Sequence, residues 1–204
     1  MLHLTTVQPD TLGLLKKLMR LPELEVFNLA GGTALALQIG HRHSVDLDFF
    51  GDVAFDAAEV MAAIKDFAEV GIINQSRSIL ILNTDGVKTD FVRYRYPLLN
   101  PIVIIDDIRM LSTLDIGAMK IAAITNRGRQ RDFYDLFFLL KIYSLRQLLD
   151  AYNTKYTDGS EFLALKSIIY FEDAEEDDMP AVFDSTITWE LVKVTIEKSI
   201  RNLE

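Results

Sequence analysis

Two adjacent glycines, Gly31 and Gly32, constrain the fold more than any other feature of this sequence. They lie between a short apolar run, Val26–Ala30 (VFNLA), and a run of strong helix formers, Thr33–Ile39 (TALALQI). A second strand is predicted at Val45–Phe50 (VDLDFF), where alternate residues share a face. The order strand, glycine turn, helix and strand predicts an α/β arrangement at the start of the chain.

The remaining cap and turn signals extend this pattern. Asp56 and Glu59 form a capping box that opens a helix to about Val70, and the turn Asn83–Gly86 indicates a hairpin. The hairpin strands are expected at 78–82 and 87–94, an edge strand at 102–105, and helices at 11–21, 113–125, 132–143, 145–153, 161–171 and 188–202. We therefore expect an α/β (α+β) lobe with a mixed sheet over residues 1–110, followed by an all-helical C-terminal lobe over residues 111–204.

The composition is typical of a globular protein with a sizeable core, because half of the 204 residues are apolar and 25% are charged. Cysteine is absent, which excludes a disulfide framework, a zinc–thiolate site and a thiol nucleophile. The N-terminus lacks the pattern of a secretory signal, and no apolar stretch approaches the roughly 18 residues of a membrane span. We expect a cytoplasmic protein with no membrane partner.

The net charge of −9 argues against nucleic-acid binding by bulk electrostatics, since such proteins are usually basic. Much of the acidity is concentrated in residues 172–178 (EDAEEDD), which favours a solvated loop. The densest basic stretch is residues 127–131 (RGRQR), including Arg131, and it is the candidate contact for phosphates of a triphosphate or RNA. The alternative is a solvated loop at a helix cap.

Asp46 and Asp48 are the first candidates for catalysis. Two carboxylates at positions i and i+2 of a strand point the same way and can share one or two Mg²⁺ (or Mn²⁺) ions. Such ions neutralise triphosphate oxygens and activate an attacking hydroxyl in phosphoryl-type transfer. Taken alone, such a pair is more often a solvated strand face or a partner for an arginine.

Gly31, Gly32 and Thr33 strengthen the metal interpretation, because a glycine turn at a helix N-terminus lets backbone amides approach a phosphate. Thr33 adds a hydroxyl donor. A tight strand-to-helix turn would also need these glycines, but it does not explain why the paired aspartates follow on the next strand. Asp90, in the hairpin, could supply a third carboxylate as metal ligand or base, or could instead pair with a nearby Lys or Arg.

Two longer segments, 31–50 (GGTALALQIGHRHSVDLDFF) and 119–140 (MKIAAITNRGRQRDFYDLFFLL), resemble the AbiEii/AbiGii toxin family of minimal nucleotidyltransferases. The resemblance runs from about residue 25 to 145. It implies a polymerase-β-type nucleotidyltransferase-like lobe with a helical C-terminal lobe and a nucleoside triphosphate (NTP) bound in the cleft between them. Members of the family act as toxins of toxin–antitoxin or phage-defence systems, and some relatives add nucleotides to tRNA acceptor ends.

The resemblance also implies roles for individual residues. The nucleotide and metal residues of the family correspond to Gly31, Gly32, Asp46 and Asp48, and the hydroxyl of the motif corresponds to Ser44. The later motifs correspond to Lys120 and Asp135, and a third carboxylate corresponds to Asp90.

Simple helix geometry gives alternatives for the later residues. Lys120 could snorkel to solvent from an apolar helix instead of binding the triphosphate. Asp132 and Asp135 share a helix face, and Arg131 is spaced to pair with Asp135. Trp189 is expected to anchor the terminal helix to the core.

These observations together predict a Mg²⁺-dependent, pyrophosphate-releasing nucleotidyltransferase that transfers a nucleoside monophosphate (NMP) from an NTP to an acceptor hydroxyl. The expected acceptor is an RNA 3′ end, most simply that of tRNA, and a cognate antitoxin is a possible partner. Two alternatives stay open: nucleotidylation or phosphorylation of a protein target, and a catalytically inactive binding subunit.

Overall fold

The computed structural model describes residues 1–203, which form two compact units. The first unit consists of Met1–Pro97 with Pro101–Leu111, and the second consists of Leu98–Asn100 with the described residues from Ser112 onward. A short segment before Pro101 thus belongs to the second unit, although the chain returns to the first unit immediately afterwards.

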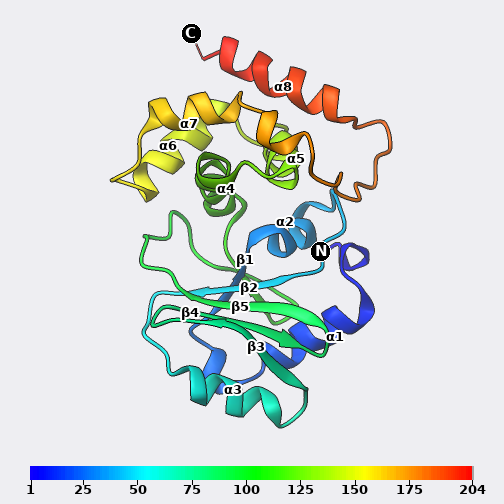
Figure 1. The fold of residues 1–204 in the computed structure, drawn as a ribbon, viewed down its shortest axis with the longest axis vertical. Helices are drawn as coiled ribbons and strands as arrows, with labels where there is room; N and C mark the ends of the chain where they lie inside the picture. The colour runs from blue at the N-terminus through cyan, green and yellow to red at the C-terminus, as the bar shows by residue number, and fades with distance from the viewer. Residues whose placement is uncertain (204) are drawn as a thin grey trace. The chain divides into compact units, whose positions relative to one another are not determined.

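The first unit is built on one seven-stranded mixed sheet in the order β3-β4-β5-β2-β1-β7-β6. Figure 1 shows β2, β5, β4 and β3 following one another across this sheet. β2 pairs with β1 in antiparallel fashion and with β5 in parallel, so it is a central strand of mixed pairing. The strand bounds are β1 Asn28–Ala30, β2 Leu47–Gly51, β3 Val70–Gln75, β4 Ile79–Thr84, β5 Val87–Arg93, β6 Val103–Ile105 and β7 Ile108–Met110.

Three α-helices belong to the first unit: α1 (Pro9–Leu18), α2 (Gly31–Ile39) and α3 (Ala57–Lys65). α3 starts where the sequence predicts, because the Asp56 side chain accepts a hydrogen bond of 2.7 Å from the backbone N–H of Ala58. α2 directly continues β1, so the expected glycine turn is the first turn of the helix itself.

The main differences from the expectations concern two strands, the end of one helix and the exposure of Val45. The helix expected to reach Val70 ends at Lys65, and β3 begins at Val70, where a short exposed strand gives little hydrophobic alternation. β7 was not predicted, because its hairpin turns through Asp106 and Asp107, which adopt positive φ without glycine. Val45 is 56% exposed and precedes β2, so it is not a core residue.

From Leu47 onward β2 alternates as expected. Leu47 and Phe49 are buried, whereas Asp48 and Phe50 are partly exposed on the other face. The ring of Phe49 stacks on Phe91 of β5 with 5.2 Å between centroids, which ties the two strands together beneath the polar face.

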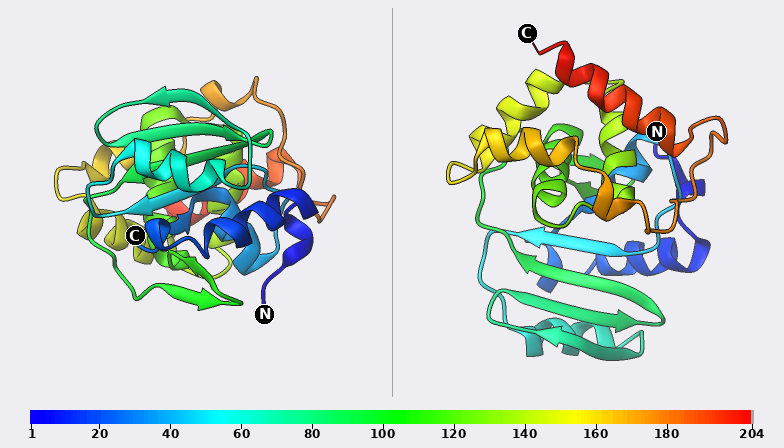
Figure 2. Two further views of the ribbon diagram at one scale, coloured as in Figure 1. Left: turned by 90° about the horizontal axis from the view of Figure 1, so that it is seen from below. Right: turned by 45° about the horizontal axis from the view of Figure 1, so that its top comes forward.

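The second unit is helical throughout its described elements, as expected for the C-terminal part (Figure 2). Its α-helices are α4 Thr113–Arg127, α5 Gln130–Leu139, α6 Leu145–Lys155, α7 Glu161–Ile168 and α8 Trp189–Arg201. Four of them begin at a Ser or Thr whose side chain accepts a backbone N–H: Ser112, Ser144, Ser160 and Thr188. Local sequence therefore sets most helix starts in this unit.

Trp189 anchors α8 to α5, as expected. Its ring stacks on Tyr134 at 5.9 Å between centroids and meets Phe133 and Phe171 edge-on at 5.7 Å. The indole N–H donates to Glu175 at 3.0 Å, which satisfies its one polar group.

A fully buried ion pair, Lys155 with Asp115, lies inside the second unit. Their side chains are 0% exposed and the Lys155 Nζ to Asp115 Oδ1 distance is 2.7 Å. Asp115 also accepts hydrogen bonds from the backbone N–H groups of Leu99 and Asn100 and from the hydroxyl of Ser112. One carboxylate therefore joins α4, α6 and the segment before Pro101.

Among residues 1–203 there is no helix both long and apolar enough to cross a membrane.

Replacing Lys155 with Met should destabilise the second unit by about 3–5 kcal/mol, because it leaves the buried Asp115 carboxylate without its cation. Chemical denaturation followed by the fluorescence of Trp189, the only tryptophan in the sequence, measures this unit directly. Arg146→Met is the control, since the ion pairs of Arg146 with Asp150 and Glu161 lie at the surface, where such pairs contribute little to stability. Equal effects of the two changes would contradict a structural role for the buried pair.

Candidate active site

Asp48 lies directly against the start of α2. In the antiparallel pairing of β1 and β2, Ala30 is the partner of Asp48, which brings the next residue, Gly31, beside the carboxylate. Gly31 has φ +64°, and a Cβ at this position would overlap Oδ2 of Asp48. Glycine is required here both by the backbone conformation and by the carboxylate that occupies the space of a side chain.

Asp90 is the neighbour of Asp48 on the other side. β2 and β5 run parallel with Asp48 opposite Asp90, so both side chains leave the same face of strands about 4.7–4.9 Å apart. Asp90 Oδ2 is 2.5 Å from Lys88 Nζ, which realises the lysine pairing considered from sequence. The other oxygen, Oδ1, is buried and has no hydrogen-bond partner. Asp90 therefore lies beside Asp48 and is also paired with Lys88.

Asp46 immediately precedes β2 and is partly exposed. Its backbone carbonyl accepts a short hydrogen bond from Thr33 Oγ1, which also lies 2.8 Å from Ser44 Oγ. Since a hydroxyl has one proton, Thr33 donates to Asp46 and Ser44 donates to Thr33. The two hydroxyls thus bind α2 to the segment that carries the aspartates, and the Thr33 hydroxyl is engaged within the chain.

Arg42 is a member of this site that sequence reasoning did not single out. It is only 5% exposed, its Nη1 donates to the carbonyl of His43 at 2.9 Å, and a Cβ on Gly32 would overlap its Nη2. α2 has no acidic residue in its first turn and no capping side chain. The Arg42 guanidinium thus lies beside the first turn of α2, while the Asp48 carboxylate lies against Gly31 at the same helix start. The signal in the sequence was an arginine shortly before the paired aspartates.

The carboxylates of the first unit offer the type of donor atom that a hard divalent cation prefers. Mg²⁺ prefers carboxylate oxygens, and the buried, unpaired Oδ1 of Asp90 beside Asp48 is an acceptor that lacks a partner. Within residues 1–203, however, no three His, Asp or Glu side chains are already grouped as metal ligands. A triad of Asp46, Asp48 and Asp90 therefore stays a prediction.

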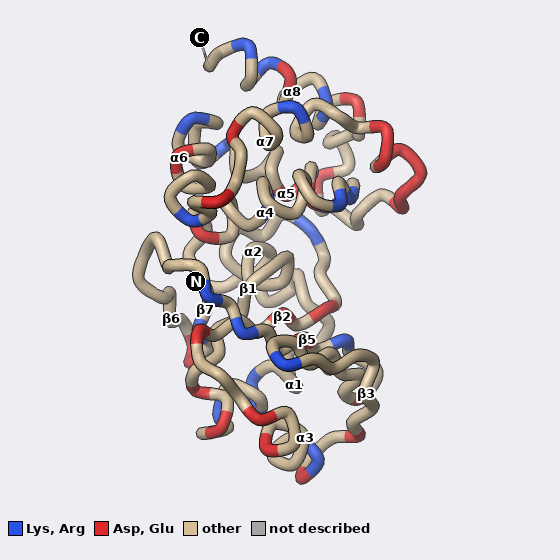
Figure 3. Tube along the Cα trace, turned by 60° about the vertical axis from the view of Figure 1, so that its left-hand side comes forward, with Lys and Arg blue, Asp and Glu red and all other residues tan. Residues whose placement is uncertain are grey.

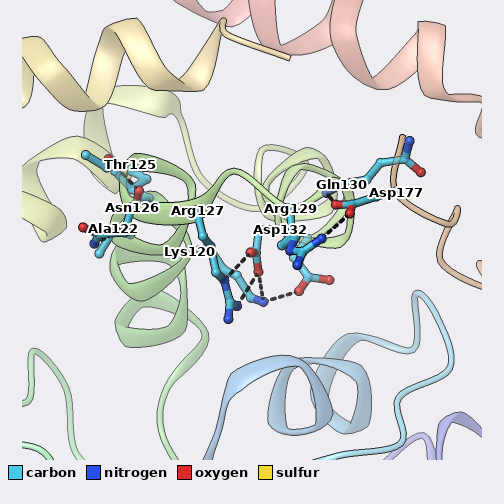
Figure 4. A network of polar contacts seen from close by, with 11 residues as sticks. Lys120, Ala122, Thr125, Asn126, Arg127, Arg129, Gln130, Asp132 and Asp177 are labelled. Carbon is cyan, nitrogen blue, oxygen red and sulfur yellow. Dashed lines mark hydrogen bonds and ion pairs between the residues drawn. The ribbon is translucent and has the colours of Figure 1, made fainter. Parts of the chain in front are cut away.

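The second unit carries the other predicted residues in a buried ionic cluster (Figure 4). Lys120 Nζ lies 2.8 Å from Asp132 Oδ1 and 2.6 Å from Asp135 Oδ2, and both carboxylates are 0% exposed. Arg127 reaches the same Asp132 through Nε at 3.1 Å. Lys120 is 6% exposed and does not reach solvent as a snorkelling lysine would.

This cluster balances two cations against two carboxylates. Burial would raise the pKa of Asp132, but the charges of Lys120 and Arg127 outweigh it and lower the pKa below its usual value. Arg127 of α4 is therefore engaged in an ion pair with Asp132 of α5, so it helps to hold these two helices together. Of the basic segment 127–131, Arg129 instead pairs with Asp177 at 2.5 Å, and Arg131 is exposed.

Comparison with known proteins identifies the family. The model of the nucleotidyl transferase AbiEii toxins of type IV toxin–antitoxin systems matches residues 13–104 and 85–191. An Aquifex aeolicus (strain VF5) protein, uncharacterized protein aq_aa25, is 37% identical over 193 residues, which is 92% of each chain. The chain belongs to the AbiEii family. It is a nucleotidyltransferase of the toxin–antitoxin type, as the resemblance implied.

This AbiEii protein is similar to solved structures from Helicobacter pylori. A Helicobacter pylori protein described as a candidate nucleotidyltransferase superposes with a TM-score of 0.57 at 20% identity, covering 97% of this chain and 99% of the other. The H. pylori protein JHP933 matches at 19% identity over 97% of both chains, with a TM-score of 0.49. The first of these supports an α/β nucleotidyltransferase fold.

Replacing Gly31 with Ala should abolish most transferase activity, because the added Cβ must push the Asp48 carboxylate aside. Gly86→Ala is the matched control: Gly86 also has positive φ (+85°), but a Cβ there meets nothing within 4 Å. Both changes should cost about 1 kcal/mol of backbone strain. Initial rates of NMP transfer from a labelled NTP, compared at equal folded fraction, measure the difference. Equal rates in the two variants would show that the close approach of Gly31 and Asp48 is irrelevant to activity.

Acid should destabilise the second unit in a way that depends on Asp132. Its folded-state pKa is lowered, so its contribution is fully present above the unfolded value of about 3.9 and is lost as the pH falls through the folded value. Asp132→Asn should be less stable at neutral pH and lose less stability below about pH 4. Urea unfolding of both proteins from pH 7 to 2, followed by Trp189 fluorescence, gives the comparison. Parallel pH profiles would contradict the assignment.

Proposed function

We propose that this AbiEii protein transfers an NMP from an NTP to the 3′-terminal hydroxyl of an RNA, most simply tRNA, with release of pyrophosphate. The observation that carries the proposal is the alignment of Asp48 with Asp90 on adjacent parallel strands, with the side-chain-free Gly31 against Asp48. One substrate can then be bound by both features, because the carboxylates suit the cation of an NTP and the helix N-terminus suits its phosphates.

Each residue of the first unit has a task in this proposal. The first amides of α2 hold a phosphate, and Gly32 keeps the approach open, with Arg42 as the adjacent cation. Thr33 and Ser44 keep the segment before β2 bound to α2, so that the aspartates and the amides stay in register. The absence of acidic side chains from the first turn of α2 leaves the amides and Arg42 uncompensated by the helix itself.

Asp46, Asp48 and Asp90 would hold Mg²⁺ or Mn²⁺, which would neutralise triphosphate oxygens and activate the acceptor hydroxyl. Lys88 already neutralises one oxygen of Asp90 and leaves the other available. In the second unit, we assign Lys120 and Asp135 to binding or orienting the triphosphate and acceptor. Their mutual pairing supports this role by holding the ammonium in one fixed orientation.

The choice of an RNA acceptor rests on the basic segment and on the simplicity of a terminal hydroxyl as nucleophile. Arg129 pairs with Asp177, and Arg131 is exposed, so these two arginines are our candidates for RNA phosphates. Replacing them tests RNA docking without uncovering Asp132. A cognate antitoxin is the partner that a toxin of this family implies.

Protein nucleotidylation is the alternative that the same catalytic residues would support. Incubation of the protein with labelled NTP, purified tRNA and host-cell proteins separates the two, because the label enters one pool or the other. Label confined to protein would overturn the RNA assignment while keeping the transferase.

Asp48→Asn should strongly reduce NMP transfer, and Asp46→Asn should act similarly. The loss should exceed the factor of about 10 to 100 that is typical when a residue next to a metal ligand is changed. Asp52→Asn is the control. Asp52 is exposed and lies one residue beyond β2, and its replacement removes the same charge. Growth of a bacterial host expressing each variant, with sequencing of tRNA 3′ ends, provides the cellular measurement. Toxicity that persists in Asp48→Asn would show that catalysis is not its cause.

A further inference from the structure

The arginine segment of the second unit is in contact with the chain's own acidic segment, residues 172–178. Asp177 Oδ1 lies 2.5 Å from Arg129 Nη1, and Asp177 Oδ2 accepts the backbone N–H of Gln130 at 2.9 Å (Figure 4). A carboxylate from a distant part of the chain is thus seated between a guanidinium and the first amide of α5, with its two oxygens divided between the two donors.

The surroundings of Asp177 favour a negative charge. Partial burial would raise its pKa, but the Gln130 amide and the Arg129 guanidinium outweigh this, with a further contribution from the charge of Arg131, and the pKa is lowered. Arg129 is 59% exposed, so its donors remain open to solvent on the side away from Asp177. The position therefore binds an anion and can be reached from solution.

The acidic segment is held in place at a second point. Glu175 accepts from the Trp189 indole and from Lys193 of α8, at 3.0 and 2.9 Å. Figure 3 shows the segment as a run of acidic residues on the loop that precedes α8. Asp178, the residue that follows Asp177 in this segment, is exposed. The segment is thus anchored to α8 and presents Asp177 to α5.

We propose that the Gln130 amide, Arg129 and Arg131 form a phosphate-binding site and that Asp177 is its internal competitor. A phosphate offers anionic oxygens to the same amide and guanidinium, and it takes the place of the carboxylate when it binds. The phosphate belongs to an RNA backbone or to a triphosphate. The proposal deepens the proposed function by naming its RNA or NTP contact, but phosphate binding here requires no catalysis.

Competition by Asp177 has two measurable consequences. Removing its charge should strengthen phosphate binding by about two- to fivefold, the factor that corresponds to an exposed ion pair. For a polynucleotide, the logarithm of the binding constant should fall more steeply with the logarithm of the salt concentration. The slope should increase by up to about the value of one phosphate contact, because one more protein cation becomes available.

Asp177→Asn is the decisive variant, because asparagine keeps one acceptor for the Gln130 amide but removes the charge and the acceptor that faces Arg129. Asp178→Asn is the matched control, with the same change in net charge one residue away. Equilibrium titrations of the full chain with inorganic tripolyphosphate and with a short single-stranded RNA distinguish the two sources of phosphate, and neither involves turnover. Thermal unfolding of each variant confirms that folded protein is compared.

The expected result is tighter binding of at least one probe by Asp177→Asn and little change in Asp178→Asn. Arg129→Ser should weaken that binding, and combined with Asp177→Asn it should remove the gain. Equal gains in the two aspartate variants would reduce the effect to net charge and overturn the proposal. If neither tripolyphosphate nor the RNA binds, the proposal is overturned as well. Loss of NMP transfer in Asp48→Asn is independent of all these outcomes, so failure of this site and failure of the catalytic proposal are distinguishable.

Discussion

The register of β2 between its two neighbours is the constraint on which the candidate site depends. Antiparallel pairing with β1 sets Asp48 against the start of α2, and parallel pairing with β5 sets it beside Asp90. The buried side of the same strand keeps this register, because Phe49 stacks on Phe91 in the core. A slip by one residue would exchange the faces and bury the carboxylates.

Close contacts at α2 explain why a pair of glycines stands there. Asp48 occupies the side-chain space of Gly31, and Arg42 occupies that of Gly32. Opposite charges thus reach the helix N-terminus from two sides, one suited to a cation and the other to a phosphate. This arrangement supports the proposed function, because a triphosphate arrives as an anion with its metal.

Buried charges organise the second unit in a different way. Lys120 pairs with Asp132 and Asp135, and Lys155 pairs with Asp115, in buried contacts between different helices. Buried pairs of this kind are costly to break, so they favour one packing of the helices. Asp177 with Arg129 is the contrasting case, since that guanidinium is largely exposed and the pair can exchange with another anion.

The sequence by itself determined the order of elements around Gly31, the polar face of β2, the capped helices and the resemblance to AbiEii toxins, because these depend on local spacing and chemistry. It missed β3 and β7, whose exposed or very short strands show no clear alternation, and it left the partners of Asp90 and Lys120 open. Arg42, Asp115 and Lys155 were not singled out, since no local pattern distinguishes a buried charge from a solvated one. Only the tertiary structure decided these points, because strand register and helix packing join residues that are far apart in the chain.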